Sequence, residues 1–168
     1  RLYSYEGLVF RGDSREPTDI IEQSGGFKSK RSLSNPENLL EAQGLGQGIG
    51  ATGQSGVSCA KQLDGAFPYC TTDQVGYVYI VDTTKLGPGN KAYDMADISM
   101  RNGFKARDET GGEVNVTNIP PYAIIGWLEI PTAGDILDGG GDVTSTMLDT
   151  LKLEQVHMNP MYGVELTD

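Results

Sequence analysis

The chain has 168 residues, a length that fits one compact domain, and we predict a single domain over residues 1–168. It holds 13 Lys+Arg and 23 Asp+Glu, and the formal net charge of -10 argues against a surface built to neutralise nucleic-acid phosphates. No run of about 18 apolar residues occurs, so we expect no membrane span. Residues 1–31 carry six basic and five acidic side chains, so a small anionic ligand is expected to find its positive charge there.

A short strand and a short helix are predicted near the N-terminus. Leu8-Val9-Phe10 is an apolar run of strand type, and Pro17 followed by Gly25-Gly26 outlines a helix that starts and stops within a few residues. Between them, Arg11-Gly12-Asp13 has two interpretations: a cell-adhesion tripeptide, or a strand-end arginine that binds phosphate. Because an adhesion motif needs an exposed, mobile loop tip, its place between a strand and a helix disfavours adhesion.

The glycine-rich residues 44–53 contain a G-x-G-x-x-G match, but the context is wrong for a dinucleotide-binding turn. That turn needs a strand before the glycines and a helix after them, whereas a helix-like segment at 38–42 precedes them here. We therefore predict a flexible connection, since glycine places little steric constraint on the backbone.

Two cysteines, Cys59 and Cys70, are separated by ten residues, and this spacing favours a disulfide over two unpaired, buried thiols. A disulfide would imply a secreted protein, and the acceptor sequon at 115–117 is consistent with secretion. No signal peptide is present at Arg1, so we expect that a leader, if there was one, has been removed. His157 is the only histidine, which disfavours a zinc site and the histidine-based catalytic triads and dyads.

Three strands are predicted from the alternation of apolar, β-branched and aromatic residues: Gly76–Asp82, Glu113–Val116 and Ile124–Ile130. Short strands with few helices predict an α+β or mainly β core. In the tail, residues 135–142 hold three aspartates among glycines, and a solvated turn is favoured there over a calcium loop. Residues 145–156 are predicted to form an amphipathic helix.

The stretch FRGDSREPTDIIEQSGGF, residues 10–27, resembles the start of cholera-toxin-like and heat-labile-enterotoxin-like mono-ADP-ribosyltransferases. The family has Arg-x-Asp-Ser-Arg at the end of a strand, then a proline-led helix and a Ser-Gly-Gly-like turn. GYVYIVD at 76–82 resembles the family's central strand, and residues 113–127 resemble its catalytic-glutamate strand, Ile-Pro turn and Gly-Trp strand. The resemblance covers roughly residues 3–130. It implies an α+β fold, the split β-sandwich core of ADP-ribosyltransferases with short helices, and NAD as the substrate.

The family's core elements are an arginine, a Ser-Thr-Ser strand and a glutamate that ends a Glu-x-Glu or Gln-x-Glu motif. Arg11 matches the arginine and Glu113 the essential glutamate. Ser58 matches the leading serine, but Cys59 and Ala60 replace the threonine and the second serine. The minimal Arg-Ser-Glu set is therefore present, but the two residues that follow the serine differ from the family pattern.

The resemblance assigns a role to each retained residue. Glu113 would stabilise the positive charge that develops on the ribose as the nicotinamide bond breaks. Arg11 would bind the NAD diphosphate through paired donors, and Ser58 would orient the Glu113 carboxylate. Gly12 and Asp13 would shape the pocket wall. Taken singly, the same residues also fit a surface ion pair, a strand serine and a solvated glutamate.

Gly111 stands where the family has the glutamate or glutamine that faces the acceptor. Three outcomes follow: transfer to an acceptor that needs no such help, hydrolysis of NAD by water, or binding without turnover. Glu109 could compensate if the glycines let the loop fold back. The resemblance makes the loop at 102–112, led by Phe104, the surface that contacts the target.

The cysteine loop is a further departure from the family. A Cys59–Cys70 disulfide would tie the serine strand to the next segment and place that loop at the edge of the nicotinamide pocket. Phe67 or Tyr69 would then be available to stack on a ring, although packing of both in the core is an equal alternative.

We therefore predict a secreted toxin-like or effector-like mono-ADP-ribosyltransferase, a virulence factor delivered into host cells that uses NAD to modify a host acceptor. A protein acceptor is favoured over nucleic acid because the chain is acidic. The alternatives are an NAD glycohydrolase, an inactive protein that keeps the fold and binds a partner, and an adhesion ligand.

Overall fold

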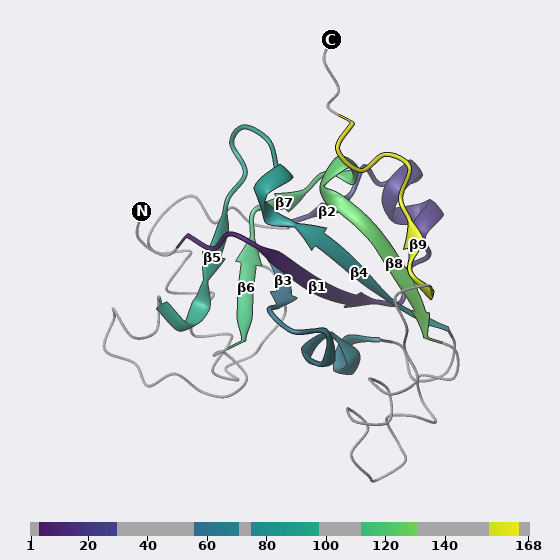
Figure 1. Ribbon diagram of the computed structural model, residues 1–168, viewed down its shortest axis with the longest axis horizontal. Helices are drawn as coiled ribbons and strands as arrows, with labels where there is room; N and C mark the ends of the chain where they lie inside the picture. The colour runs from purple at the N-terminus through teal and green to yellow at the C-terminus, as the bar shows by residue number, and fades with distance from the viewer. Residues whose placement is uncertain (1–3, 30–55, 71–74, 98–111, 131–154, 165–168) are drawn as a thin grey trace, which may run out of the picture.

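A computed structural model describes residues 4–29, 56–70, 75–97, 112–130 and 155–164, apart from the side chain of Pro68. In these residues the chain forms a seven-stranded sheet, a two-stranded sheet and several short helices (Figure 1). The elements, in chain order, are β1 (Leu8–Asp13), η1 (Thr18–Gln23), β2 (Phe27–Lys28), β3 (Val57–Ala60), η2 (Leu63–Tyr69), β4 (Gly76–Asp82), η3 (Thr83–Lys85), β5 (Ala92–Asp94), β6 (Glu113–Val116), β7 (Asn118–Ile119), η4 (Pro121–Ala123), β8 (Ile124–Ile130) and β9 (His157–Met158).

The three predicted strands are confirmed with the predicted bounds, as β4, β6 and β8. The predicted N-terminal strand runs further, through Arg11 to Asp13, because β1 pairs along its whole length with β4. The predicted helix after Pro17 is η1, which closes with a hydrogen bond of 2.7 Å from the Ser24 amide to the Asp19 carbonyl. The segments predicted at 38–42, 44–53 and 135–142 lie outside the described residues, as do all but the last two residues of the tail helix.

The large sheet is antiparallel throughout and has the strand order β5-β6-β3-β1-β4-β8-β9. The strand pairing is sparse at the centre of this sheet, between β1 and β3. β1 pairs with β4 over six residues but meets β3 at a single pair, Phe10 and Ala60. Beyond that pair the strands separate, and β5 and β6 run at a steep angle to β1, β4 and β8 (Figure 1). The α+β, split-sandwich fold class predicted from the sequence is confirmed.

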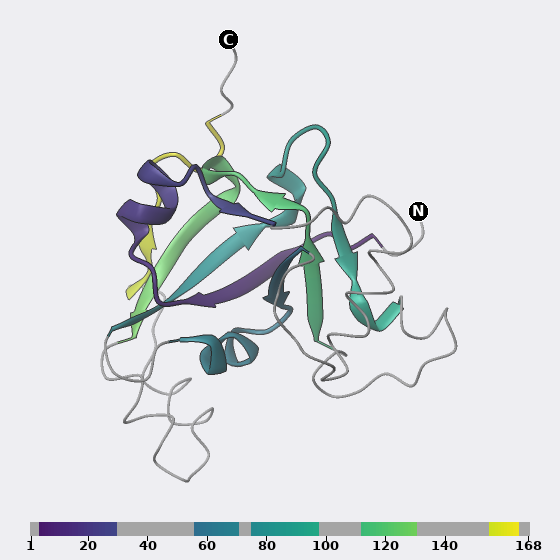
Figure 2. The same ribbon diagram turned by 180° about the vertical axis from the view of Figure 1, so that it is seen from behind.

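Two hydrophobic clusters cover the two faces of this sheet. The first packs Val9, Tyr79 and Val114 from the strands against Ile20 of η1 and Phe27 of β2. The second packs residues of η2, β4 and β8, and its members are Ala66, Phe67, Cys70, Val78, Leu128 and Ile130. η1 and η2 accordingly lie on different sides of the sheet in both views (Figures 1 and 2). In the part of the chain that the structure describes, no helix is long and apolar enough to cross a membrane.

Glycine permits two close backbone contacts that hold the layers together. A Cβ at Gly12 of β1 would lie 2.0 Å from the Ala66 carbonyl oxygen of η2. A Cβ at Gly26, where φ is +97°, would lie 2.0 Å from the Ile119 carbonyl oxygen of β7. Both sites therefore need glycine for the space it leaves, and Gly26 also needs it for its backbone conformation.

We predict that Gly26→Ala destabilises the protein far more than Gly89→Ala. Both glycines have positive φ, so each alanine carries a backbone cost of about 1–2 kcal/mol. Gly89 has open space around its Cβ position, whereas Gly26 faces the backbone, which adds about 1–3 kcal/mol of overpacking. Urea unfolding of the two variants measures the difference, and equal losses would contradict the packing role of Gly26.

Candidate active site

Arg11 on β1 reaches across to β3, at the place where the pairing of the two strands ends. Its Nη1 donates a hydrogen bond of 2.8 Å to the Ser58 carbonyl oxygen on β3, and its Nη2 lies 3.4 Å from the Asp13 carboxylate. Its guanidinium carbon stacks 5.1 Å from the centre of the Phe27 ring. The Nε atom is buried and has no hydrogen-bond partner. The guanidinium is thus fixed on several sides and retains an unused donor.

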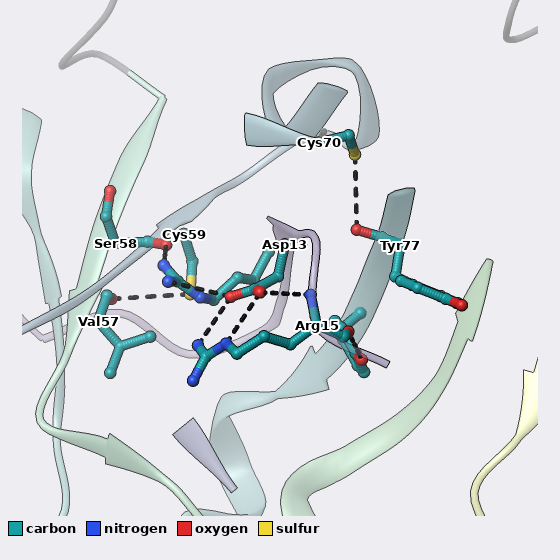
Figure 3. Close-up of polar contacts among 9 residues, drawn as sticks. Asp13, Arg15, Val57, Ser58, Cys59, Cys70 and Tyr77 are labelled. Carbon is teal, nitrogen blue, oxygen red and sulfur yellow. Dashed lines mark hydrogen bonds and ion pairs between the residues drawn. The ribbon is translucent and has the colours of Figure 1, made fainter. Parts of the chain in front are cut away.

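Asp13 is the negative group that holds two arginines in place. Its carboxylate accepts hydrogen bonds from Arg15 Nε at 3.0 Å, Arg15 Nη2 at 2.8 Å and the Arg15 amide at 2.9 Å, and Figure 3 shows the paired side chains. The Arg15 carbonyl accepts from the Tyr79 hydroxyl at 2.6 Å. Burial alone would raise the pKa of Asp13, but the hydrogen bonds from Arg15 and the charges of both arginines outweigh it and leave the pKa below its usual value.

This geometry decides between the two interpretations of Arg11-Gly12-Asp13. Gly12 is buried, and Asp13 is only 8% exposed within β1. A receptor would need the Asp13 carboxylate free, whereas Arg15 and Arg11 already occupy it. The tripeptide is a strand segment that forms the site, and nothing in its exposure supports adhesion.

Glu113 lies across β3 from this cluster. The register pairs Ala60 with Glu113 and Ser58 with Asn115, so alternation puts all four side chains on one face. The Ser58 hydroxyl donates to Glu113 Oε2 at 3.0 Å. Burial raises the pKa of Glu113, while hydrogen bonds from Ser58 and Asn115 oppose that rise. The carboxylate is therefore oriented by neutral donors in a partly desolvated setting.

Ser58 connects the two halves of the site, because its carbonyl binds Arg11 and its hydroxyl binds Glu113. The structure thus brings together the three residues that the sequence analysis selected. Gly12 and Asp13 adjoin them in β1. Phe104, Glu109 and Gly111, predicted to face the target, lie outside the described residues.

The two aromatic residues of η2 differ in position. Phe67 is buried in the second cluster, so of the two alternatives it follows packing in the core and not stacking on a ligand ring. Tyr69 exposes 67% of its surface, and its pKa is raised by desolvation and then by the negative charge of Glu113, while the Arg11 charge opposes the rise. Tyr69 therefore borders both halves of the site and is available to a ligand.

Three further residues at the site were not assigned roles from the sequence. Arg15 matched the family pattern but was given no function. Both guanidiniums stack on the Phe27 ring, and that of Arg15 lies 5.6 Å from the ring centre. Asn115 reaches Glu113 from the next position on the same strand face. Strand alternation after Glu113 could have identified Asn115, but no local signal identifies Phe27, which arrives from a separate sheet. Among the described residues, no cluster of three or more His, Cys, Asp or Glu side chains could hold a metal ion.

The predicted Cys59–Cys70 disulfide is wrong for this structure, in which both cysteines are free and buried. Cys59 points into the first cluster and Cys70 into the second, so the sheet lies between them. Figure 3 shows the two thiols directed to different carbonyls, those of Val57 and Tyr77. Sequence separation did not reveal this because it does not say which face of the sheet each residue occupies.

Comparison with known proteins finds no matching family model and no matching curated protein. Solved structures do match. The heat-labile enterotoxin of E. coli is 19% identical, with a TM-score of 0.59 over 92% of this chain and 77% of that chain. Scabin toxin from Streptomyces scabies in complex with NADH is 19% identical, with a TM-score of 0.56 over 94% and 76%. A guanine-specific ADP-ribosyltransferase is 19% identical, with a TM-score of 0.57 over 95% and 79%. The chain has the fold of ADP-ribosyltransferase toxins, as the sequence resemblance implied.

We predict that both thiols resist labelling in the folded protein. Burial raises the pKa of Cys59 to about 12 and that of Cys70 to about 11, so neither forms much thiolate near neutral pH. A maleimide reagent should label neither thiol in buffer at pH 7.5 and both in denaturant without reductant. Failure of both to react in denaturant unless reductant is added would indicate a disulfide and contradict the structure.

We also predict that Glu113→Gln makes the protein more stable at pH 7. The folded-state pKa of Glu113 lies above its ordinary value of 4.5, so the folded state binds the extra proton between the two values. The stability that this proton provides is complete below pH 4.5 and is lost as pH rises through the folded pKa. Glutamine keeps an oxygen for the Ser58 hydroxyl and does not ionise.

Urea unfolding between pH 4.5 and pH 7.5 tests this prediction. The advantage of Glu113→Gln should grow with pH, by up to about 1.4 kcal/mol for each unit by which the pKa is raised. Glu129→Gln, on the exposed side of β8, is the matched control and should show no such trend. A Gln variant that is less stable than the wild type at pH 7 would contradict the desolvation of Glu113.

Proposed function

We propose that this protein is an NAD-dependent mono-ADP-ribosyltransferase of the toxin or effector type. The observation that carries the proposal is the junction at Ser58, where Arg11 from one half of the sheet and Glu113 from the other bind the same residue. Two neighbours in fold support it: one is a toxin in complex with NADH and another is a guanine-specific ADP-ribosyltransferase.

The residues of the arginine cluster fit the diphosphate of NAD. Two guanidiniums and one carboxylate leave a net positive charge, and both arginines stack on Phe27, which limits their motion. The Arg11 side chain is 24% exposed, and a phosphate oxygen would bind the accessible part of its guanidinium. Arg11 and Arg15 would therefore bind and orient NAD, while Asp13 fixes their geometry.

Glu113 would act at the ribose. As the bond between the ribose carbon and the nicotinamide nitrogen breaks, its electron pair goes to the nicotinamide and positive charge develops on the ribose. A carboxylate held close to that carbon stabilises the charge electrostatically. Ser58 would hold the carboxylate in place through the bond at 3.0 Å. The acceptor would then form the new bond to the ribose carbon and lose a proton.

The acceptor is the open part of the proposal. We propose transfer to a host macromolecule after secretion or delivery, with a protein acceptor expected from the acidic composition. The guanine-specific neighbour makes a nucleobase acceptor the alternative to test. Hydrolysis of NAD by water is a second candidate, because Gly111 offers no side chain to position an acceptor.

Nicotinamide release from NAD by the purified protein tests the proposal. We expect Glu113→Gln to lower release by about 100-fold or more, the usual cost of removing a charge-stabilising group, with little change in KM. Parallel reactions contain buffer alone, a host-cell lysate or guanine-containing DNA. Stimulation by lysate or DNA identifies the acceptor class, whereas equal release in all three indicates hydrolysis.

Glu129→Gln is the control for this experiment, since it removes an exposed carboxylate from β8 and should retain full activity. Circular dichroism confirms that each variant is folded. Release that persists in Glu113→Gln would contradict the assignment of Glu113. A folded wild type that releases no nicotinamide in any reaction would contradict the enzyme and favour a protein that acts by binding a partner.

A further inference from the structure

Asn115 is a buried amide at the centre of the site's strand face. It follows Glu113 by two residues on β6, so both side chains project from the same side of the strand. Its direct cross-strand neighbours are Ser58 on β3 and Tyr93 on β5. Only 3% of Asn115 is exposed, which makes it one of the few buried polar residues among those described.

A buried amide is costly unless its polar atoms find partners. The Asn115 side chain lies on the same face of β6 as the Glu113 carboxylate, and the Ser58 hydroxyl donates to that carboxylate from β3 at 3.0 Å. Burial raises the pKa of Glu113, and these two donors act against the rise. Asn115 thus contributes to the charge state of Glu113 from its own strand.

Residues 115–117 form a glycosylation sequon, but the Asn115 side chain is buried and the Thr117 hydroxyl is hydrogen-bonded within the protein. Asn115 is inaccessible to a modifying enzyme in the folded chain. The Thr117 hydroxyl donates to Asn90 Oδ1 at 3.0 Å and accepts from the Lys91 amide at 2.9 Å. The motif therefore lends no support to glycosylation of the folded domain, and another role for Asn115 is required.

The two carboxylates of the site are held in opposite ways. Asp13 is surrounded by two guanidiniums that neutralise it. Glu113 lies beside an amide and a hydroxyl, which are neutral groups that orient a carboxylate without cancelling its charge. An uncompensated negative charge is what a cationic transition state requires.

We propose that Asn115 is a positioning residue for Glu113, which together with Ser58 forms a two-donor clamp that keeps the carboxylate ionised and aimed. The catalytic consequence of the clamp rests on the proposed function, whereas the clamp itself is a property of the free protein. Asn115 touches no substrate in this account and acts only through Glu113.

Other titratable groups near Glu113 do not obscure a test of the clamp. Arg11 contributes a guanidinium from β1, and it binds the Ser58 carbonyl on the neighbouring strand. The pKa values of Tyr69 on η2, Cys59 on β3 and Tyr93 on β5 are all raised, chiefly by desolvation. Among these described groups, Glu113 is the one whose titration the test follows.

The test is to measure the pKa of Glu113 by carbon NMR in protein labelled at the glutamate carboxyl carbon, with Glu113→Gln used to assign the signal. Asn115→Leu keeps the branched shape of the side chain and removes the donor, and Asn115→Ala removes the donor without adding bulk. We expect the pKa of Glu113 to rise by about one unit in both, since a hydrogen bond to a charged group is worth one to two such units.

Asn159 provides the matched control. It is also a buried amide, but its Nδ2 donates to the Pro121 and Ile124 carbonyls at 2.8 Å each, away from Glu113. Asn159→Ala should lower stability without moving the pKa of Glu113. An unchanged pKa of Glu113 in either folded Asn115 variant would overturn the clamp.

Nicotinamide release separates this inference from the proposed function. In the Asn115 variants, the acidic limb of kcat/KM should move to higher pH by the same amount as the NMR pKa, with KM for NAD unchanged. Turnover by the wild type without a pKa shift in the variants contradicts the clamp and leaves the function standing. A pKa shift in a protein that cleaves no NAD supports the clamp and contradicts the function.

Discussion

The hydrogen bond from Arg11 Nη1 to the Ser58 carbonyl crosses the place where the large sheet separates. The strand pairing between β1 and β3 consists of the single pair Phe10 and Ala60, so this bond is a second direct link between the two halves of the site. The fold supports this bond from both sides. Phe27 lies under the guanidinium, and Gly12 lets η2 pack directly on β1. The guanidinium of Arg11, held by these contacts, lies where the sheet separates.

The two halves of the candidate site carry charge in different ways. Asp13 orders the arginines while leaving net positive charge on their side. Neutral donors hold Glu113 on the other side, so its negative charge remains available. The cost is stability, because burial of an ionised carboxylate disfavours the folded state at neutral pH. Such a sacrifice of stability is common where a site needs a desolvated charge.

Much of this arrangement could be predicted from the sequence, and the exceptions share a physical cause. β4 and β8 are seven residues long and alternate clearly, and each of Arg11, Ser58 and Glu113 stands in its own short motif that can be read locally. Strands of two or three residues, such as β2 and β5, are too short to show a period. The roles of Phe27 and Asn115 depend on register between distant segments. The disulfide prediction failed for the same reason, since the spacing of two cysteines does not say on which face of the sheet each one lies.

We propose that Arg11 binds the diphosphate of NAD whether or not Glu113 is intact. Calorimetric titration of NAD into Glu113→Gln measures this directly, because that variant should leave the ligand intact. We expect NAD to bind to Glu113→Gln, and its affinity to fall at least about tenfold when Arg11→Lys is added, since lysine cannot reproduce the paired donors of a guanidinium. Equal affinity of the single and double variants, or no binding by folded Glu113→Gln, would contradict a role of Arg11 in binding NAD.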